Sequence, residues 1–349
     1  MEVSVTVTTH EPLSLAVTEP SQVGEVRRAA GALAGRLGFD ETRRGEVAIV
    51  ATELATNLVR HASGGEVIVQ SFAEGDAFGL ELMALDRGPG IGNVSEALRD
   101  GYSTGGSPGT GLGAMKRLAS TFEIFSTLGS GTAVLVRFRS GDPLPGVPRP
   151  CCIGSICLPK RGEAACGDAW YATDLDATRT VILVADGLGH GLQAADASRQ
   201  AVRLFRQDPH LPGPRQVEVL HAGLRATRGA AVAVIALDHA ERKVRFTGVG
   251  NIAGAIVAGD ASRSLLSHNG TVGAEVRRVQ EMTYDWPAGS LLVLHSDGLS
   301  SQWQLGKYPG LRFRHPSLIA GVLFRDHRRE RDDATVLVIG GGSDGRHPA

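Results

Sequence analysis

The sequence lacks the features that would set it apart from ordinary soluble globular proteins. Its 36 Lys and Arg residues nearly balance its 37 Asp and Glu residues, and the net charge of −1 leaves no positive surplus for nucleic acid or anionic lipid. Its apolar runs, such as TVILVA (180–185), have the length of strands and are too short to span a bilayer. The N-terminus shows no basic region followed by an apolar one, as a secretion signal would. We therefore expect a cytoplasmic protein that binds neither nucleic acid nor a membrane.

Cysteine is scarce as well. The four residues are grouped at Cys151, Cys152, Cys157 and Cys166. They form no repeated C-x-x-C pair and have no nearby histidine at ligand spacing, which a structural zinc site would need. The spacing favours reduced thiols on strands of a cytosolic domain, with a zinc site as the alternative.

The length of 349 residues is comfortable for two domains, and one segment has the composition of a linker between them. SGDPLPGVPRP (140–150) contains four prolines, which remove hydrogen-bond donors and favour extended chain. We expect a first domain over 1–140, a linker over 141–150, a second domain over 151–340 and a tail over 341–349.

The two halves differ in their hydrophobic patterns. In the first, helical spacing predicts helices over 24–38, 43–62 and 111–119, and alternation predicts strands over 66–72 and 78–85 and a hairpin over 122–138. The second contains six short strand-like runs, with helices predicted over 191–207, 215–226 and 316–324. The first half is therefore expected to be an α/β layer structure, and the second to contain antiparallel sheets flanked by helices.

Residues suited to a nucleotide site are spread over the first half in a fixed order. Glu53 and Asn57 are four residues apart on one helical face, where an acid can activate a hydroxyl and an amide oxygen can bind Mg²⁺. DRGPGI (86–91) places Asp86 at a strand end, before glycines that permit close backbone approach. GTGLG (109–113) then opens a helix, whose free N–H groups can receive phosphate, and GSGT (129–132) turns the following hairpin.

In this order the four motifs resemble the GHKL, or Bergerat, ATP-binding α/β sandwich of histidine kinases, gyrase and Hsp90. The wording of ATELATN (51–57), DRGPGI and FEIFSTLGSGTAV (122–134) is similar to the anti-sigma-factor kinase branch, especially the RsbT-like serine/threonine switch kinases. The resemblance implies that Glu53 is the general base, Asn57 holds Mg²⁺ and Asp86 receives the adenine amino group. The ATP-binding residues it implies are Asn57, Asp86, Gly88, Gly90, Gly109, Thr110, Gly111, Leu112, Gly113 and Thr132.

The second half carries aspartates beside its strand-like runs, and strands packed in one core can bring such ends together. Converging carboxylates repel one another unless cations are bound, and all-oxygen ligands favour Mg²⁺ or Mn²⁺. Two such ions can share a hydroxide and hold a phosphoryl group for in-line attack. A single Asp-Gly pair would more simply cap a turn, but the ordered set favours a metal centre.

GDAWYA (167–172), ADGLGHGLQAA (185–195), SLLVLHSDGL (290–299) and DDATVLV (332–338) resemble the metal-dependent PPM protein phosphatases, in the SpoIIE-like and RsbX-like branch. The resemblance implies an α-β-β-α sandwich and two Mn²⁺ or Mg²⁺ ions. The metal-binding residues it implies are Asp168, Asp186, the Gly187 carbonyl, Asp297, Asp332 and Asp333, with Asp332 favoured over Asp333. Near Asp168, the only candidate to bind phosphate is Arg161; Asn251 could either approach the site or pack at a strand end.

Together the two resemblances imply a regulator that phosphorylates and dephosphorylates serine or threonine of STAS-domain proteins in a stressosome or similar partner-switching pathway. A sigma factor or a downstream phosphatase is a further possible partner. Two alternatives keep the phosphatase: the first half is only an ATP sensor, or it is a module that binds a sigma factor or another partner. Glu53 favours catalysis, because a binding module needs no base at that position.

Overall fold

The computed structural model describes residues 12–74, 77–98, 111–140 and 150–341 of the chain. The fold divides into two compact units, the first holding the described residues up to 140 and the second those from 150. The expected linker falls almost entirely within 141–149, outside the described residues, so the domain boundaries stay a prediction. Among the described residues, no helix is both long and apolar enough to cross a membrane.

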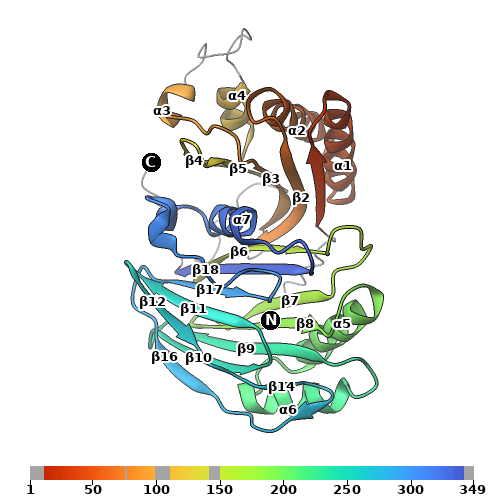
Figure 1. The fold of residues 1–349 in the computed structure, drawn as a ribbon, viewed down its shortest axis with the longest axis vertical. Helices are drawn as coiled ribbons and strands as arrows, with labels where there is room; N and C mark the ends of the chain where they lie inside the picture. The colour runs from red at the N-terminus through yellow and green to blue at the C-terminus, as the bar shows by residue number, and fades with distance from the viewer. Residues whose placement is uncertain (1–11, 75–76, 99–110, 141–149, 342–349) are drawn as a thin grey trace. The chain divides into compact units, whose positions relative to one another are not determined.

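The first unit is built on a five-stranded antiparallel sheet in the order β1-β2-β3-β5-β4 (Figure 1). The strands are β1 (Leu13–Val17), β2 (Gly65–Glu74), β3 (Ala77–Leu85), β4 (Thr121–Thr127) and β5 (Gly131–Arg139). The helices are α1 (Val23–Arg36), α2 (Glu41–His61), α3 (Val94–Ala97) and α4 (Gly111–Leu118), with a 3₁₀ turn at Pro20–Gln22.

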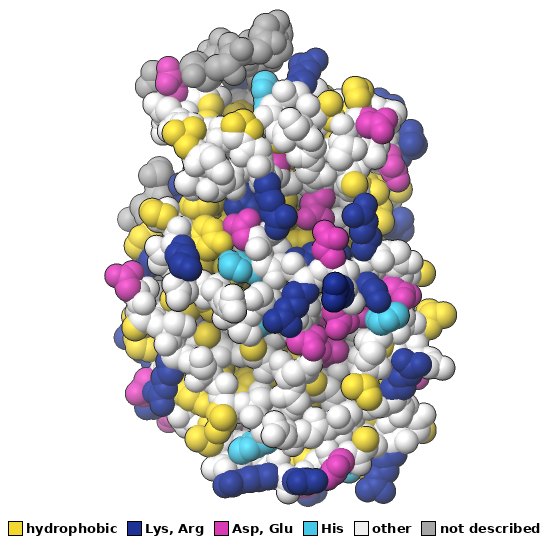
Figure 2. All heavy atoms as spheres, viewed as in Figure 1, with side chains coloured by type: hydrophobic (Ala, Val, Ile, Leu, Met, Phe, Trp, Pro, Cys, Tyr) yellow, Lys and Arg dark blue, Asp and Glu magenta, His cyan; other side chains and the backbone are white. Residues whose placement is uncertain are grey.

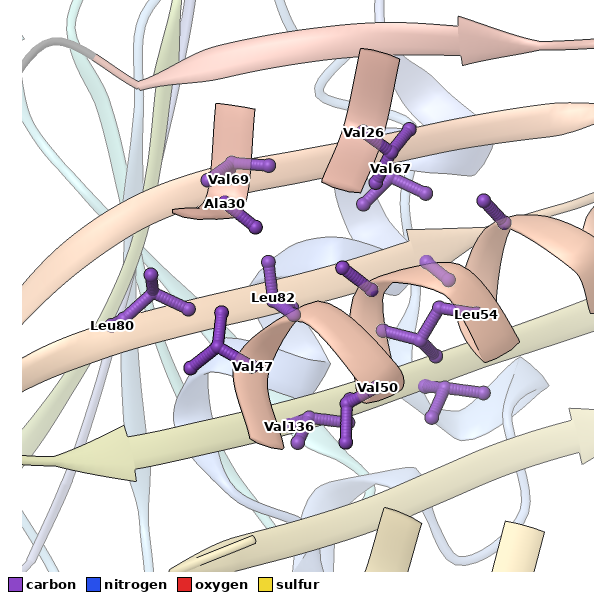
Figure 3. Packing of buried hydrophobic residues seen from close by; sticks show 14 of the residues in the cluster. Val26, Ala30, Val47, Val50, Leu54, Val67, Val69, Leu80, Leu82 and Val136 are labelled. Atoms are coloured by element: carbon purple, nitrogen blue, oxygen red, sulfur yellow. The ribbon is translucent and has the colours of Figure 1, made fainter. Parts of the chain in front are cut away.

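Helices α1 and α2 cover one face of this sheet, and their apolar stripes form the core with it (Figure 3). Val47, Val50 and Leu54 of α2 recur at helical spacing and are almost fully buried. They pack with Val136 of β5 and other apolar strand residues of the same face. Because this stripe faces the sheet, the polar residues of α2 are left on its other sides.

The second unit contains two larger sheets. The first has the order β13-β10-β9-β8-β7, with β16 paired to β10; only the β10–β13 pair is parallel. Its strands are β7 (Asp168–Asp176), β8 (Arg179–Gly187), β9 (Ala230–Asp238), β10 (Lys243–Val249), β13 (Ser267–His268) and β16 (Met282–Asp285).

The second sheet is antiparallel, in the order β12-β11-β17-β18-β6. Its strands are β6 (Cys151–Leu158), β11 (Ala253–Ala258), β12 (Ala261–Leu265), β17 (Leu291–His295) and β18 (Ala334–Gly341). A separate two-stranded ribbon joins β14 (Gly270–Thr271) to β15 (Glu275–Val276), and 3₁₀ turns lie at Leu305–Lys307 and Leu311–Phe313.

The two sheets pack face to face, and helices cover their outer faces (Figure 1). Ile182 of β8 and Leu337 of β18 belong to the core between the sheets. Leu183, the next residue on β8, points the other way and packs with Phe205 of α5 (Leu192–Gln207) and Leu220 of α6 (Gly213–Gly223). Helix α7 (Pro316–His327) lies against β6 and β18.

The fold classes expected from the sequence are therefore confirmed: an α/β sandwich is followed by an α-β-β-α sandwich. The predicted helices and strands also occur, with shifted ends; the helix expected over 215–226 is α6, which begins at Gly213 and ends at Gly223. The hydrophobic patterns gave no strand over β1 or β6, which form edges of their sheets, although the cysteines of β6 were expected to lie on strands.

Candidate functional site

Glu53 is half-buried on α2, away from the buried stripe of that helix. The helix begins after Asp40, whose carboxylate accepts a hydrogen bond of 2.7 Å from the Arg43 N–H and satisfies a free donor of the first turn. A Cβ atom added at Gly111 would lie 2.7 Å from Oε2 of Glu53. The carboxylate therefore lies against the first residue of α4, where the sequence predicts phosphate. Asn57 is half-buried one turn further along α2.

Asp86 follows the last residue of β3 and is held by backbone donors. Its Oδ1 accepts hydrogen bonds from the N–H groups of Gly88, at 2.8 Å, and Thr132, at 3.1 Å. Its own N–H donates to the Thr132 carbonyl at 2.9 Å. Thr132 is buried on β5, and its hydroxyl lies 2.9 Å from that of Ser126. Asp86 and Thr132, both predicted to bind nucleotide, are thus joined directly.

The glycines after Asp86 stand where other residues would clash. Gly90 has a φ of +72°, and an added Cβ would collide with the Thr127 carbonyl. A Cβ at Gly88 would lie 2.7 Å from Cα of Ala62, next to the end of α2. The N–H of the residue after Gly90 donates to the Ser126 hydroxyl at 2.8 Å. The loop is therefore packed between α2 and the β4–β5 hairpin.

The second glycine motif is described only in part. Gly109 and Thr110 lie outside the described residues, whereas Gly111, Leu112 and Gly113 form the first turn of α4. Gly113 is buried, and Leu112 packs partly buried against the core. The N-terminal N–H groups of a helix have no partner within it, and anions can bind to them.

In the second unit, Asp168 and Asp186 occupy directly opposite positions on the antiparallel strands β7 and β8. Side chains at opposite positions share one face of a sheet, with Cβ atoms roughly 5 Å apart. Asp168 is only 4% exposed; its Oδ2 accepts a 2.7 Å hydrogen bond from the Ser296 hydroxyl, while its buried Oδ1 has no partner among the described residues. Two carboxylates thus lie side by side, one of them with an unsatisfied oxygen.

Asp297 extends this acidic group from the other sheet, two residues after β17. Its Oδ2 accepts a 2.7 Å hydrogen bond from Nδ2 of Asn251, the residue for which the sequence left two roles open. The guanidinium of Arg329 donates to the Asp297 backbone carbonyl at 3.2 Å. Asn251 is therefore a neighbour of the acidic group and orients one of its carboxylates.

Asp332 and Asp333 precede β18 and differ in their surroundings. Oδ1 of Asp333 accepts the N–H of Lys160 at 2.7 Å, and its Oδ2 accepts the N–H of Gly167 at 2.9 Å. Among the described residues, the Asp332 carboxylate accepts one hydrogen bond, to its Oδ1 from the N–H of Asp333 at 3.0 Å. The Asp333 carboxylate is thus used to fix the chain before Asp168, and Asp332 is the better placed of the two to bind a metal ion.

These carboxylates disfavour one another's ionised forms. Burial, followed by repulsion from Asp168 and Asp297, raises the pKa of Asp186 to about 9. Burial also raises the pKa of Asp168 to about 7, against the lowering effects of the Ser296 and Thr335 hydroxyls. The pKa values of Asp297 and Asp333 are raised, in both cases mainly by burial. Acidic side chains bordered by Lys and Arg also gather on the face of the second unit shown in Figure 2.

The donor chemistry of this acidic group fits divalent cations. Among the described residues, no three Asp, Glu, His or Cys side chains already surround a common point as metal ligands. However, the unpartnered Oδ1 of Asp168 and the raised pKa of Asp186 both indicate a site that lacks positive charge. Oxygen-only ligands suit Mg²⁺ or Mn²⁺, so Asp168, Asp186, Asp297 and Asp332 are the residues that would hold such ions.

The loop after Asp186 turns sharply beside this group. A Cβ at Gly187 would collide with the Ala194 carbonyl, so only glycine allows α5 to pack this closely.

Nδ1 of His190 lies 2.7 Å from a carboxylate oxygen of Glu163, and its Nε2 lies 3.1 Å from Nζ of Lys160. His190 is thus tied to the loop before Asp168 rather than to the aspartates.

The four cysteines are free thiols, and Cys151, Cys152 and Cys157 lie on β6. The sulfur atoms of Cys157 and Cys166 are 3.7 Å apart, and the Cys157 thiol also donates to the Asp168 carbonyl at 3.6 Å. The hydrogen bond to Cys157 and then burial raise the pKa of the Cys166 thiol above its usual range. These thiols therefore pack behind Asp168 on the strand side of the site.

Two neighbours of the acidic group gave no signal in the sequence. Ser296 bridges the two sheets, because its hydroxyl donates to Asp168 and accepts the N–H of Thr335 at 3.0 Å. Arg329 is separated from Asp297 by thirty-two positions and meets it only through the fold. Ser296 directly precedes an Asp-Gly pair, and this pattern is too common for the sequence to have identified it.

Comparison with known proteins identifies both units. Residues 16–138 match the model of the histidine kinase-like ATPase domain, and residues 176–340 match that of stage II sporulation protein E, SpoIIE. The chain is 34% identical over 102 residues to the serine/threonine-protein kinase RsbT of Bacillus subtilis (strain 168), covering 29% of this chain and 77% of RsbT.

The chain is also 24% identical over 207 residues to stage II sporulation protein E of the same organism, covering 53% of this chain but only 25% of that protein. A solved structure described as "The bacterial stressosome: a modular system that has been adapted to control secondary messenger signaling" is 26% identical, with a TM-score of 0.50, covering 54% of this chain and 98% of that one. The chain therefore belongs to the RsbT family through its N-terminal histidine kinase-like ATPase domain. Residues 176–340 of its C-terminal unit are similar to SpoIIE.

Proposed function

We propose that the chain is a bifunctional partner-switching regulator that adds phosphate to, and removes it from, serine or threonine of STAS-domain proteins. The observation that carries the proposal is the acidic group of the second unit, in which a buried Asp168 oxygen lacks a partner beside the Asp186 carboxylate. The name of RsbT, a serine/threonine-protein kinase, and the stressosome named for a similar structure support the proposed substrates.

In the kinase reaction, ATP and Mg²⁺ would supply the phosphoryl group and its charge neutralisation. Asp86, fixed by the N–H groups of Gly88 and Thr132, binds the nucleotide base. Glu53 accepts the proton of the substrate hydroxyl, and its contact with Gly111 at the start of α4, where phosphate is expected to bind, supports this role. Asn57 would contribute an amide oxygen to the Mg²⁺ ion.

In the phosphatase reaction, two divalent cations would supply a hydroxide and offset the charge of the phosphoryl group. Asp168, Asp186, Asp297 and Asp332 would bind them, together with the Gly187 carbonyl. Ser296 holds the Asp168 carboxylate and Asn251 that of Asp297, so both are oriented before the ions bind. Water adds to phosphorus and the serine oxygen leaves with a proton, giving free serine and inorganic phosphate.

The kinase half is tested in the Asp186→Asn background, so that the phosphatase does not remove the product. Label from γ-labelled ATP should appear on serine or threonine of a STAS-domain protein. Adding Glu53→Gln should reduce the rate by about 10²- to 10⁴-fold, because the general base is lost. Glu41→Gln, at an exposed position in the first turn of the same helix, is the matched control.

If label transfer is absent, or is unchanged by Glu53→Gln, the kinase assignment fails. The two alternatives then separate by binding. An ATP sensor would bind ATP and change phosphatase activity, whereas a partner-binding module would retain a sigma factor or another protein without ATP.

The phosphatase half is tested by release of phosphate from a phosphoserine STAS-domain protein in the presence of Mn²⁺. Asp186→Asn should abolish the release. Asp260→Asn is the matched control, because Asp260 is exposed in the turn at the far end of β11 from Asn251. Activity retained by Asp186→Asn would exclude the proposed metal centre.

A further inference from the structure

Arg228 lies in the connection between α6 and β9, next to the loop that follows Asp186. Gly187 pairs with Ala230 across β8 and β9, and the N–H of Leu188 donates to the Gly229 carbonyl at 3.0 Å. These contacts bring residue 228 beside the loop at 187–191. A Cβ added at Gly189 would lie 3.0 Å from Nη1 of Arg228, so the guanidinium lies over this glycine.

The guanidinium of Arg228 has its donors available. In the part of the chain that the structure describes, it makes no hydrogen bond or ion pair, and the residue is exposed. An arginine that serves only the fold of an acidic region usually pairs with a carboxylate. Arg228 instead lies over Gly189, three residues after Asp186, with a planar set of donors that suits phosphate oxygens.

The other cations around the acidic group are engaged or are not placed on this loop. Nη1 of Arg329 donates to the Asp297 carbonyl, and Nζ of Lys160 lies 3.1 Å from His190, which contacts Glu163. Arg161, the arginine nearest to Asp168 along the chain, is exposed and comes from the loop before β7. Sequence proximity favoured Arg161, whereas strand pairing brings a different arginine to the loop after Asp186.

We infer that Arg228 binds the phosphoryl group of the phosphoserine or phosphothreonine substrate at the acidic site. This inference rests on the proposed phosphatase activity. A phosphate monoester brings up to two negative charges to a group of carboxylates, so a cation beyond the metal ions stabilises its binding. The absence of a side chain at Gly189 leaves room for the guanidinium to lie over the loop. Arg228 is thus a substrate-binding residue rather than a metal ligand.

The test compares Arg228→Ala, Arg228→Lys, Arg161→Ala and the control Arg225→Ala in the full chain with Mn²⁺. Arg225 is exposed in the same connection and makes no hydrogen bond or ion pair among the described residues. Hydrolysis of p-nitrophenyl phosphate and of a phosphoserine peptide gives KM and kcat, and inorganic phosphate gives an inhibition constant. Calorimetry measures Mn²⁺ and phosphate binding separately.

Arg228→Ala should raise both KM and the phosphate inhibition constant by about 10- to 100-fold, the effect of losing hydrogen bonds to a charged group. The affinity of Arg228→Ala for Mn²⁺ should stay within about twofold of that of the unaltered protein. The KM and the phosphate inhibition constant of Arg228→Lys should fall between those of the unaltered protein and of Arg228→Ala. Arg225→Ala should change none of these constants. The inference is overturned if KM and the phosphate inhibition constant are unchanged in Arg228→Ala, or if this variant loses Mn²⁺ affinity by the same factor. It is also overturned if Arg161→Ala shows the predicted effect instead.

The failure of the proposed function is distinguishable from the failure of this inference. If the unaltered protein hydrolyses neither substrate with Mn²⁺, the phosphatase proposal fails. Calorimetry of inorganic phosphate with the Mn²⁺-loaded protein then still decides the inference: weaker binding by Arg228→Ala supports a phosphate contact, and equal binding by both proteins excludes it.

Discussion

The two candidate sites treat their aspartates in opposite ways. In the N-terminal unit, Asp86 accepts two backbone N–H groups, and the protein itself satisfies its charge. In the C-terminal unit, Asp168 and Asp186 lie opposite each other and their pKa values are raised to about 7 and about 9. The first site is arranged to present one fixed acceptor to a ligand. The second has a charge that the chain leaves uncompensated, which is what a cation site requires.

The largest effects are expected from the same substitution at each site. Asp168→Asn should lower Mn²⁺-dependent phosphatase activity by about 1,000-fold, because a ligand of the ions is lost, and should leave ATP binding unchanged. Asp86→Asn should weaken ATP binding and leave the phosphatase unchanged. Titration with a fluorescent nucleotide measures ATP binding, and release of inorganic phosphate measures phosphatase activity. Loss of both functions in either variant would show that the sites are not independent.

Gly111→Ala sharpens the comparison on the N-terminal side. The new methyl group would lie 2.7 Å from Oε2 of Glu53, and the carboxylate must move. A misplacement of about 1 Å can cost about 100-fold in rate, so label transfer should fall by that order while the helix is retained. Gly45→Ala, on α2 with open space around the new Cβ, is the control. Label transfer at the normal rate would remove Glu53 from the reaction.

Ser296→Ala tests the C-terminal site with a smaller effect. The hydroxyl donates to Asp168 and accepts the Thr335 N–H, so its removal leaves both groups less well held. Partners of metal ligands typically contribute 10- to 100-fold in affinity, and we expect a loss of about 10-fold for Mn²⁺. Isothermal titration gives the affinity directly. An unchanged affinity would mean that Asp168 is oriented by the strand alone.

The smallest effect is a pH dependence of stability without metal ions. Because the pKa of Asp186 in the folded state is raised from 3.8 to about 9, the folded protein binds more protons than the unfolded chain between these values. The free energy of unfolding should therefore fall as the pH rises from about 4 to about 9. In EDTA at pH 8.5, Asp186→Asn should be more stable than the unaltered protein, and the difference should shrink at pH 5. Urea denaturation followed by circular dichroism would detect it; equal stability at both pH values would contradict the raised pKa.

Local patterns in the sequence were sufficient for much of the fold. The stripe Val47, Val50 and Leu54 predicted the buried face of α2, and the position of Glu53 on another face followed from the helical period. The edge strands β1 and β6 were missed. Strand β1 is only five residues long, and β6 mixes small residues such as Gly154 and Ser155 with its apolar ones, so neither stood out as an apolar run.

The order of motifs also indicated which aspartates belong to the second site, and the placement of Asp168 opposite Asp186 agrees with that grouping. The different surroundings of Asp332 and Asp333 depend on Lys160 and Gly167, which are far away in sequence. The contact of Ser296 with Asp168 joins two sheets across 128 positions of the chain, and Asn251 reaches Asp297 across 46 positions, between neighbouring strands of one sheet.

The sequence alone indicated most helices and strands, because helical period and strand alternation are local properties. Its ordered motifs, through their resemblance to known families, indicated the two domain types and the candidate residues of both sites. The tertiary structure decided which charges are satisfied and which are not. Asp86 meets backbone donors and Asp168 meets other acids only once strands have paired, and strand pairing alone brings Arg228 to the loop after Asp186. The physical reason is that burial and repulsion act through space, between residues that the chain order keeps apart.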